Sequence, residues 1–395
     1  ANGDNSYIDS YGNSAYKALK IDASTLKLND DSNGTITTGT GAFNVNGALT
    51  GTAATFNAIN NICQTGDEIV SADNLYGGTF TMFNDIFPQF GYKVSFVDPN
   101  VPENFAAAIT PNTKALFCET LSNPACDVAD IEAISSIAHA HGIPLIVDAT
   151  FTTPVLQRSI EFGADIVINS LTKWMGGHGT GIGGIVVDAG KFNWQSDKFP
   201  LMVEPESSYH GVRWAYDLPP ELLPVAYILR MRVVPLRNLG ACISPDNAWI
   251  FAQGIETLSL RMERHCQNAK GIAEYLQKHA QVEWVRYPGL KEDPSYALNE
   301  KYLSGMGGSM VVFGIKGGLE AGKKFIEGLE MFSHLANVGD SKSLAIHPAT
   351  TTHSQLTPEQ QGDAGISPEL VRLSIGIEHI DDIIEDIDKG LAASK

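Results

Sequence analysis

The sequence predicts an α/β protein built on a mostly parallel sheet. Short apolar runs rich in Val and Ile indicate buried strands, and helical segments lie between several of them. Strands that alternate with helices form a parallel sheet, which binds ligands beyond the carboxyl ends of its strands. The chain has 395 residues, more than one typical hydrophobic core holds, and this length favours two domains.

The beginning of the chain differs from the rest. Residues 29–52 are rich in Gly, Asn, Thr and Asp, a composition that favours turns, short strands or loops. Beyond this segment, six strands are predicted at Glu68–Ser71, Lys93–Val97, Ala115–Cys118, Pro144–Val147, Ile166–Ile168 and Ile185–Val187. Between two of these strands, Asp130–His141 carries apolar residues at helical spacing, and Gly142 ends this helix.

The second half of the chain predicts a smaller α+β domain. Segment 188–245 is rich in proline, which favours loops and short helices over the sheet. The amphipathic pattern from Trp249 to about Lys278 predicts one long connecting helix. Further elements are predicted at Ser309–Ile315 and Val371–Ile375 (strands) and near His379–Leu391 (helix). We therefore expect an atypical segment at 1–49, a large domain at 50–246 and a small domain at 247–395.

Composition excludes several classes of partner. A formal net charge of −18 argues against nucleic acid or an anionic membrane as the main partner. The five cysteines show no C-x-x-C spacing, which argues against a disulfide framework or zinc site and favours a reducing compartment. Neither a membrane-spanning apolar run nor a signal peptide is visible. We expect a cytoplasmic protein without a bound metal.

The most informative stretch surrounds Lys173. A predicted strand ends just before Ser170-x-Thr172-Lys173, and a glycine-rich run at 176–184 follows. The glycines let the backbone approach a ligand and leave the lysine at the carboxyl end of a strand. A lone lysine is usually a solvated surface charge, but the two neighbouring hydroxyls could donate to a phosphate. A lysine that forms imines must be accessible and have a lowered pKa.

Two further residues indicate pyridoxal phosphate (PLP) chemistry. Asp148 follows the apolar run at 144–147. It could cap the next helix, or its carboxylate could keep the pyridine nitrogen of PLP protonated. Tyr76 precedes Gly77 and Gly78, and it could be a core residue or could lie against a flat ring. With Lys173, these residues predict an enzyme that carries PLP as an imine.

From about Gly51 to its end, the chain resembles the PLP-dependent enzymes of Cys/Met metabolism, and among them the O-acetylhomoserine sulfhydrylases. The strings that carry the resemblance are LYGGTF, LIVDATF, SLTKWMGGHGTGIGGIVVD, SYHGV, LRMERHCQNA, YPGL, FSHLANVGDSKSLAIHPATTTHSQL and VRLSIGIEHIDDII. The resemblance implies the PLP-dependent transferase fold of the aspartate aminotransferase type (fold type I).

The resemblance also implies a role for each matching residue. Lys173 is expected to be the Schiff-base lysine and a proton shuttle, Asp148 to pair with the pyridine nitrogen, and Tyr76 to stack on the ring and assist catalysis. The other implied ligands are Ser170, Thr172, Gly51 and Thr52 for the phosphate, Asn123 for the phenolic oxygen, and Arg372 with Asn337 for the substrate carboxylate.

The implied reaction is γ-replacement on O-acetyl-L-homoserine. Sulfide or a thiol takes the place of acetate, and homocysteine or methionine results. The substrate is thus a small amino acid, and the enzyme is expected to be a homodimer or homotetramer. One alternative is a methionine or cystathionine γ-lyase, although methionine γ-lyases usually have Cys where this chain has Gly78.

A second alternative is a non-catalytic descendant of the family. Family members normally begin with an arm that carries a Tyr-x-Arg element into a neighbouring subunit's active site. Residues 1–50 contain no arginine, so this element is missing there. A metal hydrolase is less favoured, because none of the ten histidines falls in an H-E-x-x-H motif.

Overall fold

The computed structural model describes the chain from residue 51 onward, apart from 353, 355–356, 358, 360 and 362–364. Before residue 51 it describes only the backbone of four strands, β1 (Lys20–Asp22), β2 (Thr25–Asn29), β3 (Thr35–Ile36) and β4 (Phe43–Gly47). Strands β1, β2 and β3 form a small antiparallel sheet, whereas β4 joins the large sheet described next. Short strands agree with the composition of this segment.

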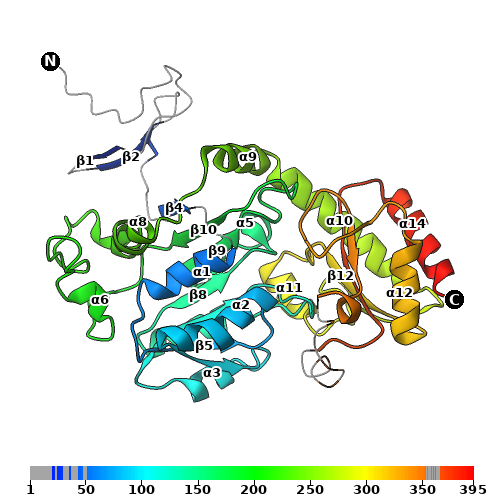
Figure 1. Cartoon of the computed structure of the whole chain (residues 1–395), viewed down its shortest axis with the longest axis horizontal. Helices are drawn as coiled ribbons and strands as arrows, with labels where there is room; N and C mark the ends of the chain where they lie inside the picture. Colours follow the sequence, from blue (N-terminus) through cyan, green and yellow to red (C-terminus); the bar gives the residue numbers. More distant parts are fainter. Residues whose placement is uncertain are drawn as a thin grey trace.

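The large sheet has seven strands in the order β4-β10-β9-β8-β7-β5-β6 (Figure 1). The new strands are β5 (Glu68–Ala72), β6 (Lys93–Val97), β7 (Thr113–Glu119), β8 (Leu145–Asp148), β9 (Ile166–Ser170) and β10 (Gly184–Asp188). Strands β5 to β9 are parallel, and β10 runs antiparallel to both β9 and β4. The prediction of a mostly parallel sheet is confirmed, as is each of its predicted strands within a residue or two.

Helices and turns surround this sheet. The helices are α1 (Gly51–Asn60), α2 (Gly77–Thr81), α3 (Glu103–Ala108), α4 (Ile131–Ala140), α5 (Thr153–Leu156), α6 (Pro200–Val203), α7 (Ala226–Met231) and α8 (Arg237–Leu239). Single turns of 3-10 or π helix lie at Met82–Ile86, Phe87–Phe90, Ser159–Phe162, Leu223–Val225, Arg232–Leu236 and Pro348–Thr350. The predicted helix at Asp130–His141 is confirmed as α4, and Asp130 caps it by accepting from Ala133 N at 3.3 Å.

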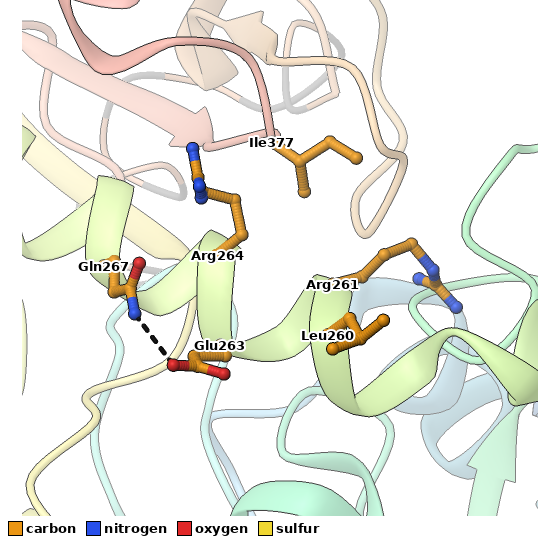
Figure 2. A pocket seen from close by; sticks show the side chains of 6 residues that line it. All are labelled: Leu260, Arg261, Glu263, Arg264, Gln267 and Ile377. Atoms are coloured by element: carbon orange, nitrogen blue, oxygen red, sulfur yellow. Dashed lines mark hydrogen bonds between the residues drawn. The ribbon is translucent and has the colours of Figure 1, made fainter.

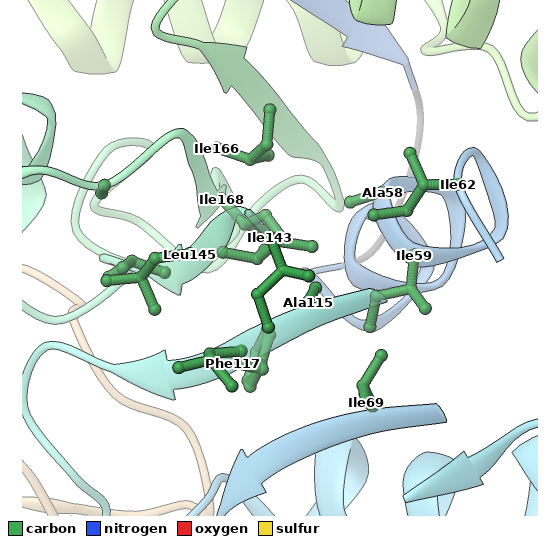
Figure 3. Close-up of a cluster of buried hydrophobic side chains, with 14 of the residues drawn as sticks. Ala58, Ile59, Ile62, Ile69, Ala115, Phe117, Ile143, Leu145, Ile166 and Ile168 are labelled. Carbon is green, nitrogen blue, oxygen red and sulfur yellow. The ribbon is translucent and has the colours of Figure 1, made fainter. Parts of the chain in front are cut away.

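The core of this part is apolar on both sides of the central strands. Figure 3 shows Ile59 of α1 beside Ile69 of β5, and Phe117 of β7 in the same cluster. Strands β5 and β7 are buried along their whole length, because helices cover the two faces of the sheet. Polar side chains that contact solvent or a ligand can therefore lie together only where these strands end.

The prediction of one long helix from Trp249 to Lys278 is wrong. The structure has two helices, α9 (Pro245–Glu256) and α10 (Leu258–Leu276), which are separated by Thr257. The carbonyl of Gly254 accepts hydrogen bonds from Arg261 Nη2 at 2.6 Å and from the Thr257 hydroxyl at 3.4 Å. Side chains thus hydrogen-bond to a carbonyl in the last turn of α9, which explains why the helix is interrupted at this point.

A second sheet of five strands occupies the C-terminal part, in the order β11-β12-β15-β14-β13. Its strands are β11 (Val282–Arg286), β12 (Met310–Ile315), β13 (Ser333–His334), β14 (Leu344–Ile346) and β15 (Leu370–Ser374). Its helices are α11 (Tyr296–Tyr302), α12 (Gly318–Gly328) and α14 (Ile380–Ala393). Helices α10, α12 and α14 pack together beside this sheet (Figure 1).

The smaller α+β architecture is therefore confirmed, as are the predicted strands and the C-terminal helix. The division into segments 50–246 and 247–395 stays a prediction. No helix among the described residues is long and apolar enough to cross a membrane.

Candidate active site

Polar side chains meet at the carboxyl ends of four neighbouring strands of the large sheet. Tyr76 follows β5, Asp148 ends β8, and Ser170 ends β9. Glu119, which the sequence interpretation did not select, ends β7. Because parallel strands end at one edge of a sheet, residues almost a hundred positions apart come together here.

Lys173 lies in the turn that follows β9. Its main-chain N donates to Ser170 O at 3.2 Å, and Gly177 N donates to Lys173 O at 2.8 Å. The Nζ atom donates to Oδ1 of Asn337, and none of the described carboxylates pairs with it. Burial lowers the pKa of Lys173 from 10.5 to about 8, and the positive charge of Arg372 adds to this effect. A fraction of the amine is therefore uncharged near neutral pH, as a nucleophile requires.

The burial of the Lys173 amine should lower the folding stability of the apoprotein. Between its folded pKa of about 8 and its ordinary value of 10.5, the unfolded chain binds more protons, so stability rises with pH. We expect the apoprotein of Lys173→Met to be about 2–3 kcal/mol more stable than the parent at pH 7. The difference should shrink as the pH rises above 8 towards 10.5. Urea unfolding at pH 7 and pH 9.5 checks this, and a constant difference would contradict it.

Asp148 is held by the residue two positions after it. Its Oδ1 atom accepts from the Thr150 hydroxyl and, at 2.9 Å, from Thr150 N. The Thr150 oxygen in turn accepts from Ser170 N at 2.8 Å, which ties the ends of β8 and β9 together. Burial raises the pKa of Asp148 to about 6. The helix-cap alternative is wrong, because Thr152 occupies the N-cap position of α5.

Glu119 lies beside Asp148, its register partner on the neighbouring strand. Its Oε1 atom accepts from Tyr76 N at 2.7 Å. Burial raises the pKa of Glu119 well above its usual range, and the charge of Asp148 acts in the same direction. The sequence signal for this residue was present: Glu119 ends an apolar strand in the same way as Asp148 does.

Tyr76 is not a core residue. Its side chain is 46% exposed, and α2 begins directly after it. A Cβ atom on Gly78 would lie 2.6 Å from Tyr76 Cε1, so only glycine leaves room for the ring in this position. The tyrosine face is thus available to a flat ligand at this edge of the sheet.

The first turn of α1 lies against the end of β9. A Cβ atom on Gly51 would lie 2.8 Å from Ser170 Cβ, so the helix start and the serine are in close contact. The unpaired N–H groups of a helix start attract anions, and both Gly51 and Thr52 lie in this turn. The hydroxyl of Thr172 is engaged with Gly183, because it accepts from Gly183 N at 3.1 Å.

Closing the contact between α1 and β9 should weaken the binding of a phosphate there. Gly51→Ala adds a methyl group in van der Waals conflict with Ser170. Such overpacking costs about 1–3 kcal/mol, so we expect PLP to bind the apoprotein about 5- to 150-fold more weakly. A PLP titration measures the change. Gly77→Ala is the control, since a Cβ there has no neighbour within 4 Å; equal affinity in both variants would contradict the assignment.

Arg372, in the middle of β15, is a buried cation that forms no ion pair with any carboxylate among the described residues. It donates from Nη1 to Asn123 Oδ1 at 3.1 Å and from Nη2 to Asn337 O at 3.3 Å. Its Nε has no hydrogen-bond partner among the described residues, and burial lowers its pKa to about 10. The same Asn337 holds the amine of Lys173 through its side chain. A carboxylate ligand would satisfy both the charge and the free donor.

These residues fit PLP. The cofactor carries a phosphate, a pyridine nitrogen and an aldehyde, and the site offers a helix start, a buried carboxylate and a lysine of lowered pKa for these groups.

A separate surface cavity of about 490 Å³ lies over α10 (Figure 2). It is lined by Leu260, Arg261, Glu263, Arg264, Gln267 and Ile377, and none of the predicted site residues lines it.

Comparison with known proteins agrees with this fold. Residues 29–392 match the family described as Cys/Met metabolism PLP-dependent enzyme. O-acetyl-L-homoserine sulfhydrylase of Leptospira meyeri is 51% identical over 86% of this chain and 78% of its own length. Homocysteine synthase of Schizosaccharomyces pombe is 47% identical over 86% of this chain and 79% of its own length.

A solved structure is similar over the same part of the chain. It is described as an O-acetylhomoserine (thiol)-lyase from Campylobacter jejuni and contains a pyridoxyl-lysine monophosphate. The two proteins superpose with a TM-score of 0.84 at 37% identity, over 89% of this chain and 83% of the other. The predicted fold class is thereby confirmed, and the chain belongs to the PLP-dependent enzymes of Cys/Met metabolism.

Proposed function

We propose that the protein is an O-acetyl-L-homoserine sulfhydrylase. It replaces the acetate of O-acetyl-L-homoserine by sulfide or a thiol and forms homocysteine or methionine. The observation that carries the proposal is the buried Arg372, which has no carboxylate partner in the described part of the chain and lies next to an amine of lowered pKa. Together they provide a binding group and a base for an amino acid. The names of the relatives support the choice of substrate.

The residues of the chain divide the work between binding and proton transfer. Arg372 holds the α-carboxylate of the substrate with two parallel hydrogen bonds, which fixes the Cα–H bond in one direction. Lys173, partly neutral near its pKa of about 8, would remove the proton from Cα and then one from Cβ, so that acetate can leave Cγ. After sulfide or a thiol has added at Cγ, the same amine would return protons to Cβ and Cα. Bound PLP supplies a ring that withdraws electrons from the substrate carbon next to the amine.

Other residues hold the cofactor in place. We assign Asp148 to the pyridine nitrogen, Tyr76 to the face of the ring and Lys173 to the covalent attachment. The phosphate ligands would be Gly51, Thr52, Ser170 and Thr172, with Asn123 near the phenolic oxygen. The Oδ1 atom of Asn123 also accepts from Arg372 Nη1, so Asn123 would link cofactor and substrate groups.

We further propose that the enzyme acts as a homodimer or homotetramer in the cytoplasm. The predicted absence of the Tyr-x-Arg element concerns residues 1–50. Apart from the backbone of β1 to β4, these residues lie outside the described part of the chain. Since this segment contains no arginine, a neighbouring subunit could not supply the arm's phosphate-binding arginine from it.

A two-substrate assay tests the proposed reaction. The PLP-loaded protein is incubated with O-acetyl-L-homoserine and sulfide, and separately with methionine. We expect homocysteine and acetate from the first mixture and little α-ketobutyrate from the second. Dominant α-ketobutyrate release from methionine would instead identify a γ-lyase. A non-catalytic descendant would show neither product and no absorbance near ~420 nm that borohydride removes.

A further inference from the structure

Glu119 and Asp148 form a pair of carboxyl groups under the proposed cofactor site. They end neighbouring parallel strands and face each other in register. Glu119 is only 7% exposed, and none of the described cationic side chains forms an ion pair with it. Glu119 is buried and Asp148 is partly buried, and negative charges on two such register partners oppose each other, so one of the two carboxyl groups should keep its proton.

The hydrogen bonds decide which carboxyl group is neutral. Asp148 accepts two bonds from Thr150, one from its N–H and one from its hydroxyl, and these stabilise the ionised form. Glu119 accepts one bond, from Tyr76 N. A protonated pyridine nitrogen at Asp148 would favour the negative charge on Asp148 still more. The proton therefore belongs on Glu119.

The single bond that Glu119 accepts comes from the residue proposed to stack on the cofactor. This hydrogen bond joins the end of β7 to the main chain at Tyr76, the residue directly before α2. Because Tyr76 is 46% exposed, other packing fixes its ring only in part. Loss of the Glu119 oxygen would leave the Tyr76 N–H without this partner and the ring less constrained.

We propose that Glu119 is a positioning residue, which as an uncharged carboxylic acid holds the main chain at Tyr76 and leaves the negative charge to Asp148. The inference rests on the proposed cofactor site but is independent of the substrate. Glutamine has the same shape and the same carbonyl acceptor as a neutral glutamic acid, so it should replace Glu119 well. Alanine removes the acceptor.

PLP affinity of the apoprotein tests this in a double-mutant cycle. We expect Glu119→Gln to bind PLP within about threefold of the parent and Glu119→Ala to bind about tenfold more weakly, as one lost hydrogen bond predicts. In a Tyr76→Ala background, Glu119→Ala should cost less than about twofold, because Glu119 acts through Tyr76. A general structural role would give the same loss in both backgrounds and would overturn the proposal.

The absorbance of bound PLP as a function of pH provides a second readout. A neutral Glu119 predicts that Glu119→Gln leaves the midpoint of the cofactor band unchanged, whereas removal of a charged group beside Asp148 would move it. A clear displacement of that midpoint, or loss of affinity in Glu119→Gln beyond threefold, contradicts the uncharged state. Both measurements use no substrate, so they stay decisive even if the enzyme proves to be a γ-lyase.

Discussion

Replacing Lys173 by methionine is expected to abolish turnover and the covalently bound cofactor. Its amine donates to Asn337 Oδ1, and burial together with the charge of Arg372 lowers its pKa to about 8. Loss of a proton-transferring group alone costs up to about 10⁴-fold in rate, and loss of covalent attachment adds to this. Steady-state assays measure the first effect, and the ~420 nm band before and after borohydride measures the second.

The matched control for this experiment is Lys191→Met, which changes an exposed lysine after β10. It should keep both activity and the cofactor band. If the Lys173 variant still shows a band that borohydride reduces, another amine carries the cofactor and the proposed site is wrong. The apoprotein of Lys173→Met is predicted to be more stable than the parent, so misfolding is not the expected cause of its inactivity.

Replacing Arg372 by leucine should weaken substrate binding while the protein still takes up PLP. Each hydrogen bond between charged groups contributes about 1.5–3 kcal/mol, so losing a two-bond carboxylate contact should lower kcat/KM at least about 100-fold, mainly through KM. Arg372→Lys should recover little of this, because an ammonium lacks the planar fork of the guanidinium. Kinetics with O-acetyl-L-homoserine measure both variants.

The Arg372 variant carries a second, independent signature. The positive charge of Arg372 contributes to the lowered pKa of Lys173, although burial contributes more. Removal of the Arg372 charge should therefore raise the pKa of Lys173. The increase in PLP uptake that accompanies deprotonation of this amine should then occur at higher pH. Arg158→Leu, which removes an exposed arginine that pairs with Glu161, serves as control and should change neither quantity. An unchanged KM in Arg372→Leu would remove this residue from the substrate site.

The sequence by itself predicted most of the helices and strands and the lysine to which we assign the reaction. The strands were predictable because buried parallel strands are continuous apolar runs, and Lys173 and Asp148 stand where two such runs end. Apolar residues at helical spacing, followed by Gly142, also predicted α4, and the structure shows that its N-cap is Asp130. The break at Thr257 was not predictable in this way, because it depends on a carbonyl of α9 that Arg261 reaches through packing.

Only the tertiary structure decided which charges face each other. Glu119 and Asp148 are neighbours because of strand register. Arg372 comes close to Lys173 because both side chains donate to Asn337, one to its side chain and the other to its main-chain carbonyl. Neither approach follows from spacing along the chain. The pKa values that make the site chemically active arise from these approaches and from burial, since both depend on which surfaces pack together and lose water.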